Sequence, residues 1–177
     1  MSDTVKNIVR FTLFIGVQVF LLNRLPPLHR FVSPYLYFLF LLWLPFRIPR
    51  MGLTLLGFAF GLVLDGFTNT PGLHAASCTL VAYARPFLIN LLMPKDATEV
   101  GHAEPSTKSM GLLPYAVYAG LLTFLHHLVL VFLEWMQFGD LWYLFMKVIA
   151  TSLVSFLLIA VTELLFNRKG RYRTNVS

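Results

Sequence analysis

The chain is a series of long apolar runs separated by short breaks that contain polar residues, glycine or proline. The runs cover residues 8–22, 33–46, 51–67, 71–93, 112–136 and 142–166. A helix needs about 20 apolar residues to cross a bilayer, and the pattern lacks the short alternating strands of an outer-membrane barrel. The sequence therefore predicts an all-α integral membrane protein, a single membrane domain built as a six-transmembrane-helix bundle.

The breaks differ in length and chemistry. The Pro26-Pro27 pair ends the first run, because proline cannot continue a helix. Ser33-Pro34 opens the second and shortest run with a suitable N-cap and a first-turn proline. Residues 95–110 form the longest polar break, which we expect to be a solvated, mobile loop, and residues 167–177 form a basic tail.

Charge is scarce and unevenly distributed. Charged residues make up 12% of the chain, compared with roughly 25% in soluble domains. With six crossings, Arg24 and Arg30 face one side of the membrane, and the other side carries both termini together with Lys6, Arg10, Arg47, Arg50, Lys95, Lys108 and the tail cations. The positive-inside rule then places both termini in the cytoplasm. No basic amphipathic face is present for nucleic acid to follow.

The middle of the chain, from Gly57 to Pro86, combines ionisable groups with small residues. Asp65, His74 and Arg85 are three of the few ionisable groups in the apolar part, and such groups are costly in a membrane unless they are paired. They therefore mark either a packing site or a functional site. The polar motif comprises Asp65, Asn69, Thr70, Pro71, Gly72, His74, Arg85 and Pro86.

Asp65 and His74 lie on either side of a short break, at similar depth. A hydrogen bond between the imidazole and the carboxylate would close the break and satisfy both groups, and a site for a polar ligand or a proton is the alternative. Arg85 lies several turns deeper, so we expect it to reach the lipid headgroups or to pair with Glu163. Pro86 predicts a kink in the same helix.

The same region carries a face of small residues. Gly57 and Gly61 form a Gly-xxx-Gly pair, which lets a second helix approach closely. That helix is either residues 71–93, which carry small residues of their own, or the transmembrane helix of a partner protein.

Two further polar pairs lie in the last two runs. Glu134 and Lys147 are nearly equidistant from their shared turn, so we expect them to face each other. His126 and His127 point about 100° apart on a helix, and at least one is expected to bond a neighbouring helix. No other His or Cys is placed to complete a metal site with His74, and no cofactor is expected.

Motifs of catalytic sites are missing from the sequence. It contains no Gly-x-Ser-x-Gly element, no His-Glu-x-x-His element and no phosphate-binding loop. The acidic residues inside the apolar runs are isolated from one another. These observations favour a protein that is not an enzyme.

The polar motif belongs to a longer pattern. The elements are Gly61-Leu62-Val63-Leu64-Asp65, Thr70-Pro71-Gly72-Leu73-His74-Ala75-Ala76 and Ala82-Tyr83-Ala84-Arg85-Pro86-Phe87, after an opening that contains Ser33-Pro34-Tyr35-Leu36-Tyr37. Together they resemble the bacterial rod shape-determining protein MreD family over the first four runs. The last two runs agree with that family only in length and hydropathy.

This resemblance implies a non-enzymatic scaffold of the cell-elongation machinery in the bacterial cytoplasmic membrane. It implies binding to the single-span protein MreC and a role in coupling MreB filaments to the wall-synthesis enzymes RodA and a penicillin-binding protein. The implied fold is similar to the six-helix substrate-binding subunits of energy-coupling-factor vitamin transporters, so a subunit that binds a small molecule or a lipid is the alternative. The candidate partner-contact residues are Gly57, Gly61, Tyr35, Tyr37 and Phe38.

Overall fold

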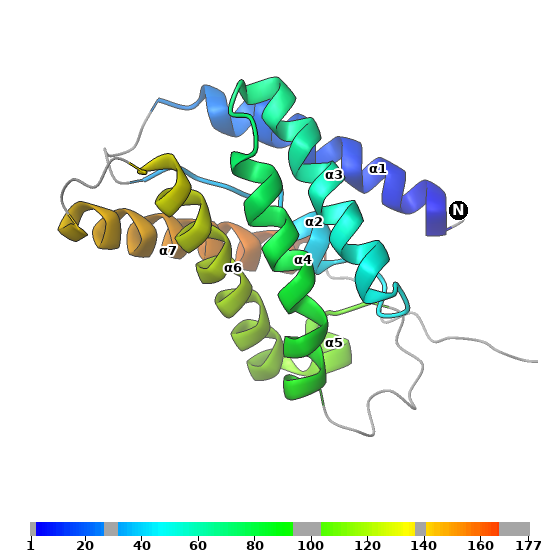
Figure 1. The fold of residues 1–177 in the computed structure, drawn as a ribbon. Helices are drawn as coiled ribbons and strands as arrows, with labels where there is room; N and C mark the ends of the chain where they lie inside the picture. The colour runs from blue at the N-terminus through cyan, green and yellow to red at the C-terminus, as the bar shows by residue number, and fades with distance from the viewer. Residues whose placement is uncertain (1–2, 27–31, 94–103, 137–140, 167–177) are drawn as a thin grey trace, which may run out of the picture.

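The computed structural model describes residues 3–26, 32–93, 104–136 and 141–166 (Figure 1). Regular elements in these ranges are helical: α1 (Asp3–Gly16), η1 (Val17–Leu21), η2 (Leu22–Arg24), α2 (Leu39–Leu42), α3 (Arg50–Thr68), α4 (Leu73–Leu92), α5 (Thr107–Met110), α6 (Leu112–Glu134) and α7 (Leu141–Phe166). The element η1 is a π-helical turn and η2 a 3-10 turn, and both continue α1.

Five helices in the described ranges are long and apolar enough to cross a membrane, namely Thr4–Arg24, Arg50–Thr68, Leu73–Leu92, Leu112–Glu134 and Leu141–Phe166. The prediction of an all-α, multi-pass membrane protein is thus confirmed by the length and composition of these helices. Helix α4 packs against α3 and against α6, and α7 packs against α6. The predicted pair between Glu134 and Lys147 is present and joins α6 to α7, with 2.9 Å between Oε2 and Nζ.

The second apolar run departs from the predicted six-helix bundle. Of residues 33–46, only α2 (Leu39–Leu42) is α-helical, which is too short to cross a membrane as a helix. We call residues 32–46 the central segment, and its side chains from Tyr37 to Leu44 are at most 3% exposed. This run is apolar because it is buried inside the bundle, and not because it faces lipid.

The central segment runs back alongside the first helix. The backbone N–H of Leu36 bonds the side chain of Gln18, near the end of that helix. Farther along, the ring of Trp43 lies 5.4 Å from the guanidinium of Arg10, nearer the start of the helix. The central segment therefore runs antiparallel to the first helix.

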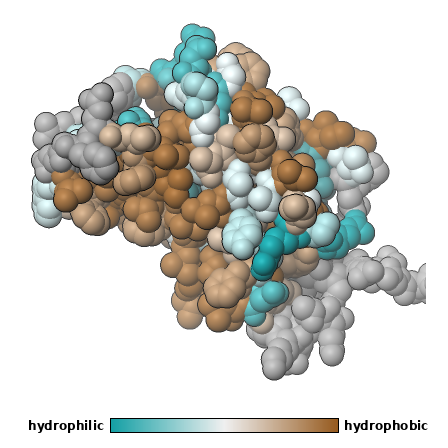
Figure 2. Space-filling model, viewed as in Figure 1, coloured by the Kyte–Doolittle hydropathy of each residue, from teal (hydrophilic) through white to brown (hydrophobic). Residues whose placement is uncertain are grey.

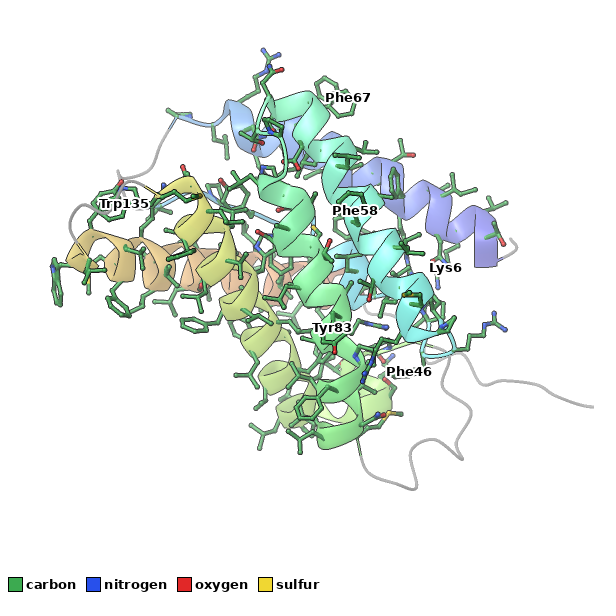
Figure 3. All side chains as sticks on the ribbon, viewed as in Figure 1. Lys6, Phe46, Phe58, Phe67, Tyr83 and Trp135 are labelled. Carbon is green, nitrogen blue, oxygen red and sulfur yellow. The ribbon has the colours of Figure 1, made fainter. Side chains whose placement is uncertain are left out.

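Both described ends of the chain lie at the same end of the bundle. The ring of Phe166, the last residue of α7, lies 6.0 Å from that of Trp43, which also contacts Arg10 of α1. We call this the terminal end, and we call the opposite end, which holds the turn between α3 and α4, the loop end. Figure 3 shows Lys6 and Phe46 toward the terminal end and Phe67 at the loop end.

The described part of the polar break, residues 104–110, is not the solvated loop that we expected. Glu104 accepts from Lys6 at 2.8 Å and from Arg10 at 3.0 Å, which ties this stretch to α1. Burial raises the pKa of Glu104, but its bonds with Lys6 and Arg10 outweigh burial and lower the pKa below its usual value. Residues 95–103 and the predicted tail at 167–177 lie outside the described residues.

Helices α3 and α4 approach each other at the predicted Gly-xxx-Gly pair. A Cβ atom added to Gly57 would lie 2.7 Å from Cβ of Ala82, and one added to Gly61 would lie 2.4 Å from the carbonyl oxygen of His74. The small-residue face is therefore used for packing inside the chain. The alternative, in which this face binds the helix of a partner protein, is wrong for this fold because α4 already covers it.

We predict that Gly61→Ala destabilises the protein by about 1–3 kcal/mol, because the added methyl group forces α3 away from the α4 backbone. Gly66→Ala is the matched control in the same helix. It meets nothing within 4 Å, so it should be neutral or stabilising by up to about 1 kcal/mol through helix propensity. Unfolding of both variants in detergent micelles measures the difference, and equal stability would contradict the close contact.

Candidate functional site

Asp65 organises the turn between α3 and α4 at the loop end. Its Oδ1 accepts from the hydroxyl of Thr70 at 3.1 Å and from the backbone N–H of His74 at 2.9 Å. Its Oδ2 accepts from the backbone N–H groups of Gly72 and Ala75, each at 3.0 Å. The residue is 3% exposed, so protein donors replace water around this carboxylate.

The backbone donors to Asp65 lie at the start of α4, which has no side-chain cap from its own N-cap residue, Gly72. The first N–H groups of a helix have no partner inside the helix, and the positive end of the helix dipole favours an anion there. Asp65 reaches over from α3 and supplies the missing cap. One carboxylate therefore fixes both the turn and the position of α4.

The structure corrects the predicted contact between Asp65 and His74. The two residues are adjacent, but the carboxylate binds the backbone N–H of His74. The imidazole points into the bundle instead, with Nδ1 2.7 Å from the hydroxyl of Tyr37. Sequence spacing predicted the depth of the two residues, but it could not distinguish the backbone of His74 from its side chain.

The other residues of the turn shape the backbone around Asp65. Asn69 ends α3 with a φ of 55°, in the left-handed region that asparagine tolerates better than most residues. The hydroxyl of Thr70 lies 2.6 Å from that of Thr68 as well as bonding Asp65. Asn69 and Pro71 are exposed, so they lie on the outside of this turn.

Tyr37 connects the central segment with α4 and α6. Its hydroxyl lies 2.7 Å from Nδ1 of His74 and 2.7 Å from Nε2 of His126. A hydroxyl has one proton to donate, so one histidine accepts from Tyr37 and the other donates to it. Phe38 stacks on His126 with ring centroids 4.3 Å apart. These four buried side chains join three elements through a single hydroxyl and a ring stack.

His127 and Ser155 hold the beginning of the central segment. Nδ1 of His127 lies 2.7 Å from the carbonyl oxygen of Thr123, so Nδ1 carries the proton. In the neutral ring, Nε2 then accepts from the hydroxyl of Ser155 at 3.1 Å. The oxygen of Ser155 accepts the backbone N–H of Tyr35 at 3.1 Å. As the sequence predicted, at least one of the two neighbouring histidines bonds a neighbouring helix, because His127 of α6 bonds Ser155 of α7.

Gln18 supports the same stretch from the first helix. Its Oε1 accepts the backbone N–H of Leu36 at 2.9 Å, and its Nε2 donates to the carbonyl oxygen of Pro34 at 3.2 Å. Nε2 also donates to Oδ1 of Asn23 at 2.8 Å. The amide of Gln18 thus bonds the backbone of this non-helical stretch as a neighbouring strand would. Gln18 is 1% exposed and lies in the π-helical turn η1.

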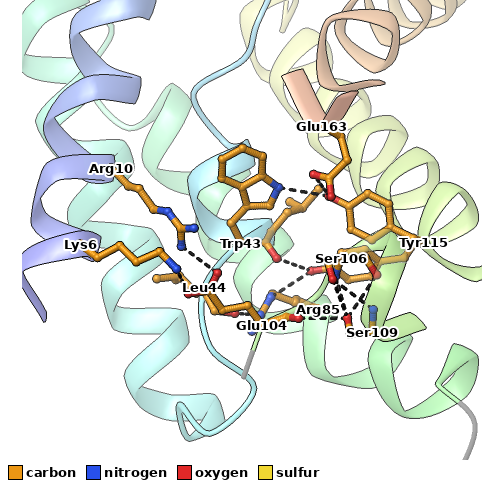
Figure 4. Close-up of polar contacts among 12 residues, drawn as sticks. Lys6, Arg10, Trp43, Leu44, Arg85, Glu104, Ser106, Ser109, Tyr115 and Glu163 are labelled. Carbon is orange, nitrogen blue, oxygen red and sulfur yellow. Dashed lines mark hydrogen bonds and ion pairs between the residues drawn. The ribbon is translucent and has the colours of Figure 1, made fainter. Parts of the chain in front are cut away.

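Arg85 binds the C-terminal half of the central segment, near the terminal end (Figure 4). It donates through its terminal nitrogen to the carbonyl oxygen of Leu44, and through Nε to the hydroxyl of Tyr118 at 3.0 Å. Tyr118 donates in turn to the carbonyl oxygen of Leu42 at 3.1 Å. Arg85 is 1% exposed, so the expectation that it reaches the headgroups is wrong. Its charge is held in the bundle by these acceptors.

Glu163 joins this cluster from α7. Its Oε2 accepts from the hydroxyl of Tyr115 at 3.1 Å, and that hydroxyl accepts from the indole Nε1 of Trp43 at 3.1 Å. The sequence offered a pair between Glu163 and Arg85 as one possibility, but the hydrogen bonds described for the two side chains lead to different partners. Arg85 binds the backbone of Leu44 directly, whereas Glu163 acts through Tyr115.

The candidate partner-contact residues of the central segment are buried. Tyr37 and Phe38 are 0% exposed, and Tyr35 is half-buried between α4 and α6. Tyr37 and Phe38 are therefore not a partner-binding surface, which corrects the prediction made from their aromatic pattern. The error follows from reading residues 33–46 as a helix with a lipid-facing side.

These residues form several groups of buried hydrogen bonds, and each group binds the irregular central segment. Sequence reasoning missed Gln18, Tyr118 and Ser155, and the only signal that marks them is a polar group inside an apolar run. Among the residues that the structure describes, no three His, Cys, Asp or Glu side chains are grouped so that they could hold a metal ion.

Comparisons of the chain with protein-family models, with curated proteins and with solved structures found no match.

We predict that Gln18→Leu destabilises the protein by about 2–4 kcal/mol, because it leaves the buried N–H of Leu36 and the carbonyl of Pro34 without the amide. Asn23→Ala is the control, since it removes only the bond between the two side chains and should cost less than about 1 kcal/mol. Denaturant unfolding in micelles compares them. A stable Gln18→Leu variant would show that the central segment does not depend on this amide.

Asp65→Asn tests the cap on α4. The amide has the same shape but turns one acceptor into a donor that faces backbone N–H groups, so we expect a loss of about 2–4 kcal/mol in unfolding free energy. Asn69→Gly is the control in the same turn and should be nearly neutral, because glycine adopts positive φ freely. If the two variants unfold alike, Asp65 is not what holds the turn.

Proposed function

We propose that this chain is a non-enzymatic membrane scaffold of the bacterial cell-elongation machinery, with both termini in the cytoplasm. Its proposed partners are the single-span protein MreC and, in the same complex, MreB, RodA and a penicillin-binding protein. The proposal rests on the resemblance of residues 61–87 to the MreD family and on the role that these residues have in the fold.

One observation favours a scaffold over a protein that binds a small molecule or a lipid. The groups that a ligand would need are bonded within the chain: Asp65 accepts four hydrogen bonds, and Arg85 binds Leu44 and Tyr118. His74 is bonded to Tyr37. A ligand that used these groups would have to displace bonds that hold the turn and the central segment. Their use in the fold favours a structural role for the polar motif.

The surfaces left for partners are the outer faces of the long helices. They carry large exposed apolar side chains, such as Leu13 of α1, Leu121 of α6 and Leu157 of α7, which are 48%, 47% and 62% exposed. In a bilayer such faces contact either lipid or the transmembrane helix of a partner, and helices associate there through close packing. A single-span partner such as MreC would bind in this way.

Photo-crosslinking in native bacterial membranes tests the scaffold. A photoreactive amino acid replaces Leu13, Leu121 or Leu157 in the tagged full chain, and Leu122 is the control because it is 0% exposed. We expect an outer-face position, and not Leu122, to crosslink a single-span membrane protein, and we expect cell-wall synthesis enzymes to co-purify in mild detergent.

The same experiment distinguishes the alternative. Co-purification of paired cytoplasmic ATPases with a membrane coupling protein would identify a transporter subunit instead. Recovery of the chain without any shape or wall-synthesis protein, under conditions where the chain remains folded, would also contradict the scaffold.

A further inference from the structure

Two exposed arginines lie where the chain leaves the central segment. Arg47 and Arg50 lie on either side of Ile48 and Pro49, and α3 begins at Arg50. The guanidinium of Arg50 lies 5.4 Å from the ring centroid of Tyr83 in α4. This cation–π contact holds a positive charge over the junction between α3 and α4.

The two helices contain no carboxylate that could neutralise this charge. From Thr4 to Lys95 the chain has one acidic residue, Asp65. It lies at the loop end of α3, far from Arg50, and it already accepts four hydrogen bonds from the turn and from α4. A negative group that complements Arg50 here has to come from outside α3 and α4.

The surroundings of Arg50 are apolar and open. Met51, Tyr83 and Phe87 are 74%, 54% and 62% exposed. Figure 2 shows apolar surface over much of this face, with hydrophilic residues gathered where α3 begins. Since α3 has 19 residues, it is about 28 Å long and nearly matches the hydrocarbon core of a bilayer, about 30 Å. The start of α3 therefore lies at the level of the lipid headgroups.

We propose that Arg50, together with the ring of Tyr83, binds the phosphate of an anionic phospholipid whose acyl chains cover the adjoining apolar face of α3 and α4. A guanidinium presents paired N–H groups that match two phosphate oxygens. A soluble anion or an acidic protein segment would neutralise the charge without also contacting Met51 and Phe87. A phospholipid satisfies the charge and the apolar surface at once.

Native mass spectrometry of the full chain tests this site. The protein is purified in an uncharged detergent and exposed to equal amounts of phosphatidylglycerol and phosphatidylcholine with the same acyl chains. We expect the wild type to retain phosphatidylglycerol preferentially. Arg50→Gln should lower that preference about fivefold. Arg24→Gln, an exposed arginine at the loop end, is the matched control and should leave the preference unchanged.

Tyr83→Leu is a second variant that keeps every charge and the apolar surface. It should lower the preference roughly twofold to fivefold through loss of the cation–π contact, and it tests the site even if Arg50→Gln does not fold. Equal retention of the two lipids by the wild type would overturn the proposal. An equal loss in Arg24→Gln would also overturn it, as would displacement of the retained phosphatidylglycerol by millimolar inorganic phosphate, which would indicate a site for a free anion.

Discussion

A chain that passes through the interior of a membrane bundle without forming a continuous helix has backbone groups that water cannot reach, and each of them needs a partner inside the protein. In the central segment, the N–H groups from Leu39 to Leu44 bond backbone carbonyls of the segment itself, and side chains of the surrounding helices bind other backbone groups of the segment. Gln18, Ser155, Tyr118 and Arg85 bind its backbone from the first helix, α7, α6 and α4. The helices position the segment, and the segment in turn joins helices that are distant in sequence. The polar interior of this protein is a consequence of that constraint.

Helix α3 contributes to the position of the central segment indirectly, because it fixes the position of α4. Its glycines let α4 approach to backbone contact, and Asp65 caps the first turn of α4 at the loop end. Since α4 carries both His74 and Arg85, its position determines where each of them meets the central segment. The proposed scaffold function would require this kind of rigidity, because partner helices could recognise the outer faces of the bundle only if the interior is held in one arrangement.

The features that could be predicted from the sequence depend on composition and spacing. Long apolar runs predicted the spanning helices, and equal distance from one turn predicted the pair of Glu134 and Lys147. Residues 33–46 were misread because a buried irregular segment is as apolar as a helix in lipid. The role of Gln18 could not be predicted either. Its backbone partners lie 16 and 18 positions away, and no sequence pattern indicates that a side chain binds backbone groups at those distances.

NMR of the chain in lipid bilayers tests the central segment most directly, through backbone chemical shifts and amide hydrogen exchange. The structure predicts non-helical shifts for residues 33–36, helical shifts for Leu39–Leu42, and slow exchange of the Tyr35 and Leu36 amides, which bond Ser155 and Gln18. Helical shifts throughout residues 33–46 would contradict the non-helical pass. Fast exchange of these two amides would show that the polar side chains are not engaged in holding the segment, and the structural role assigned to them would be wrong.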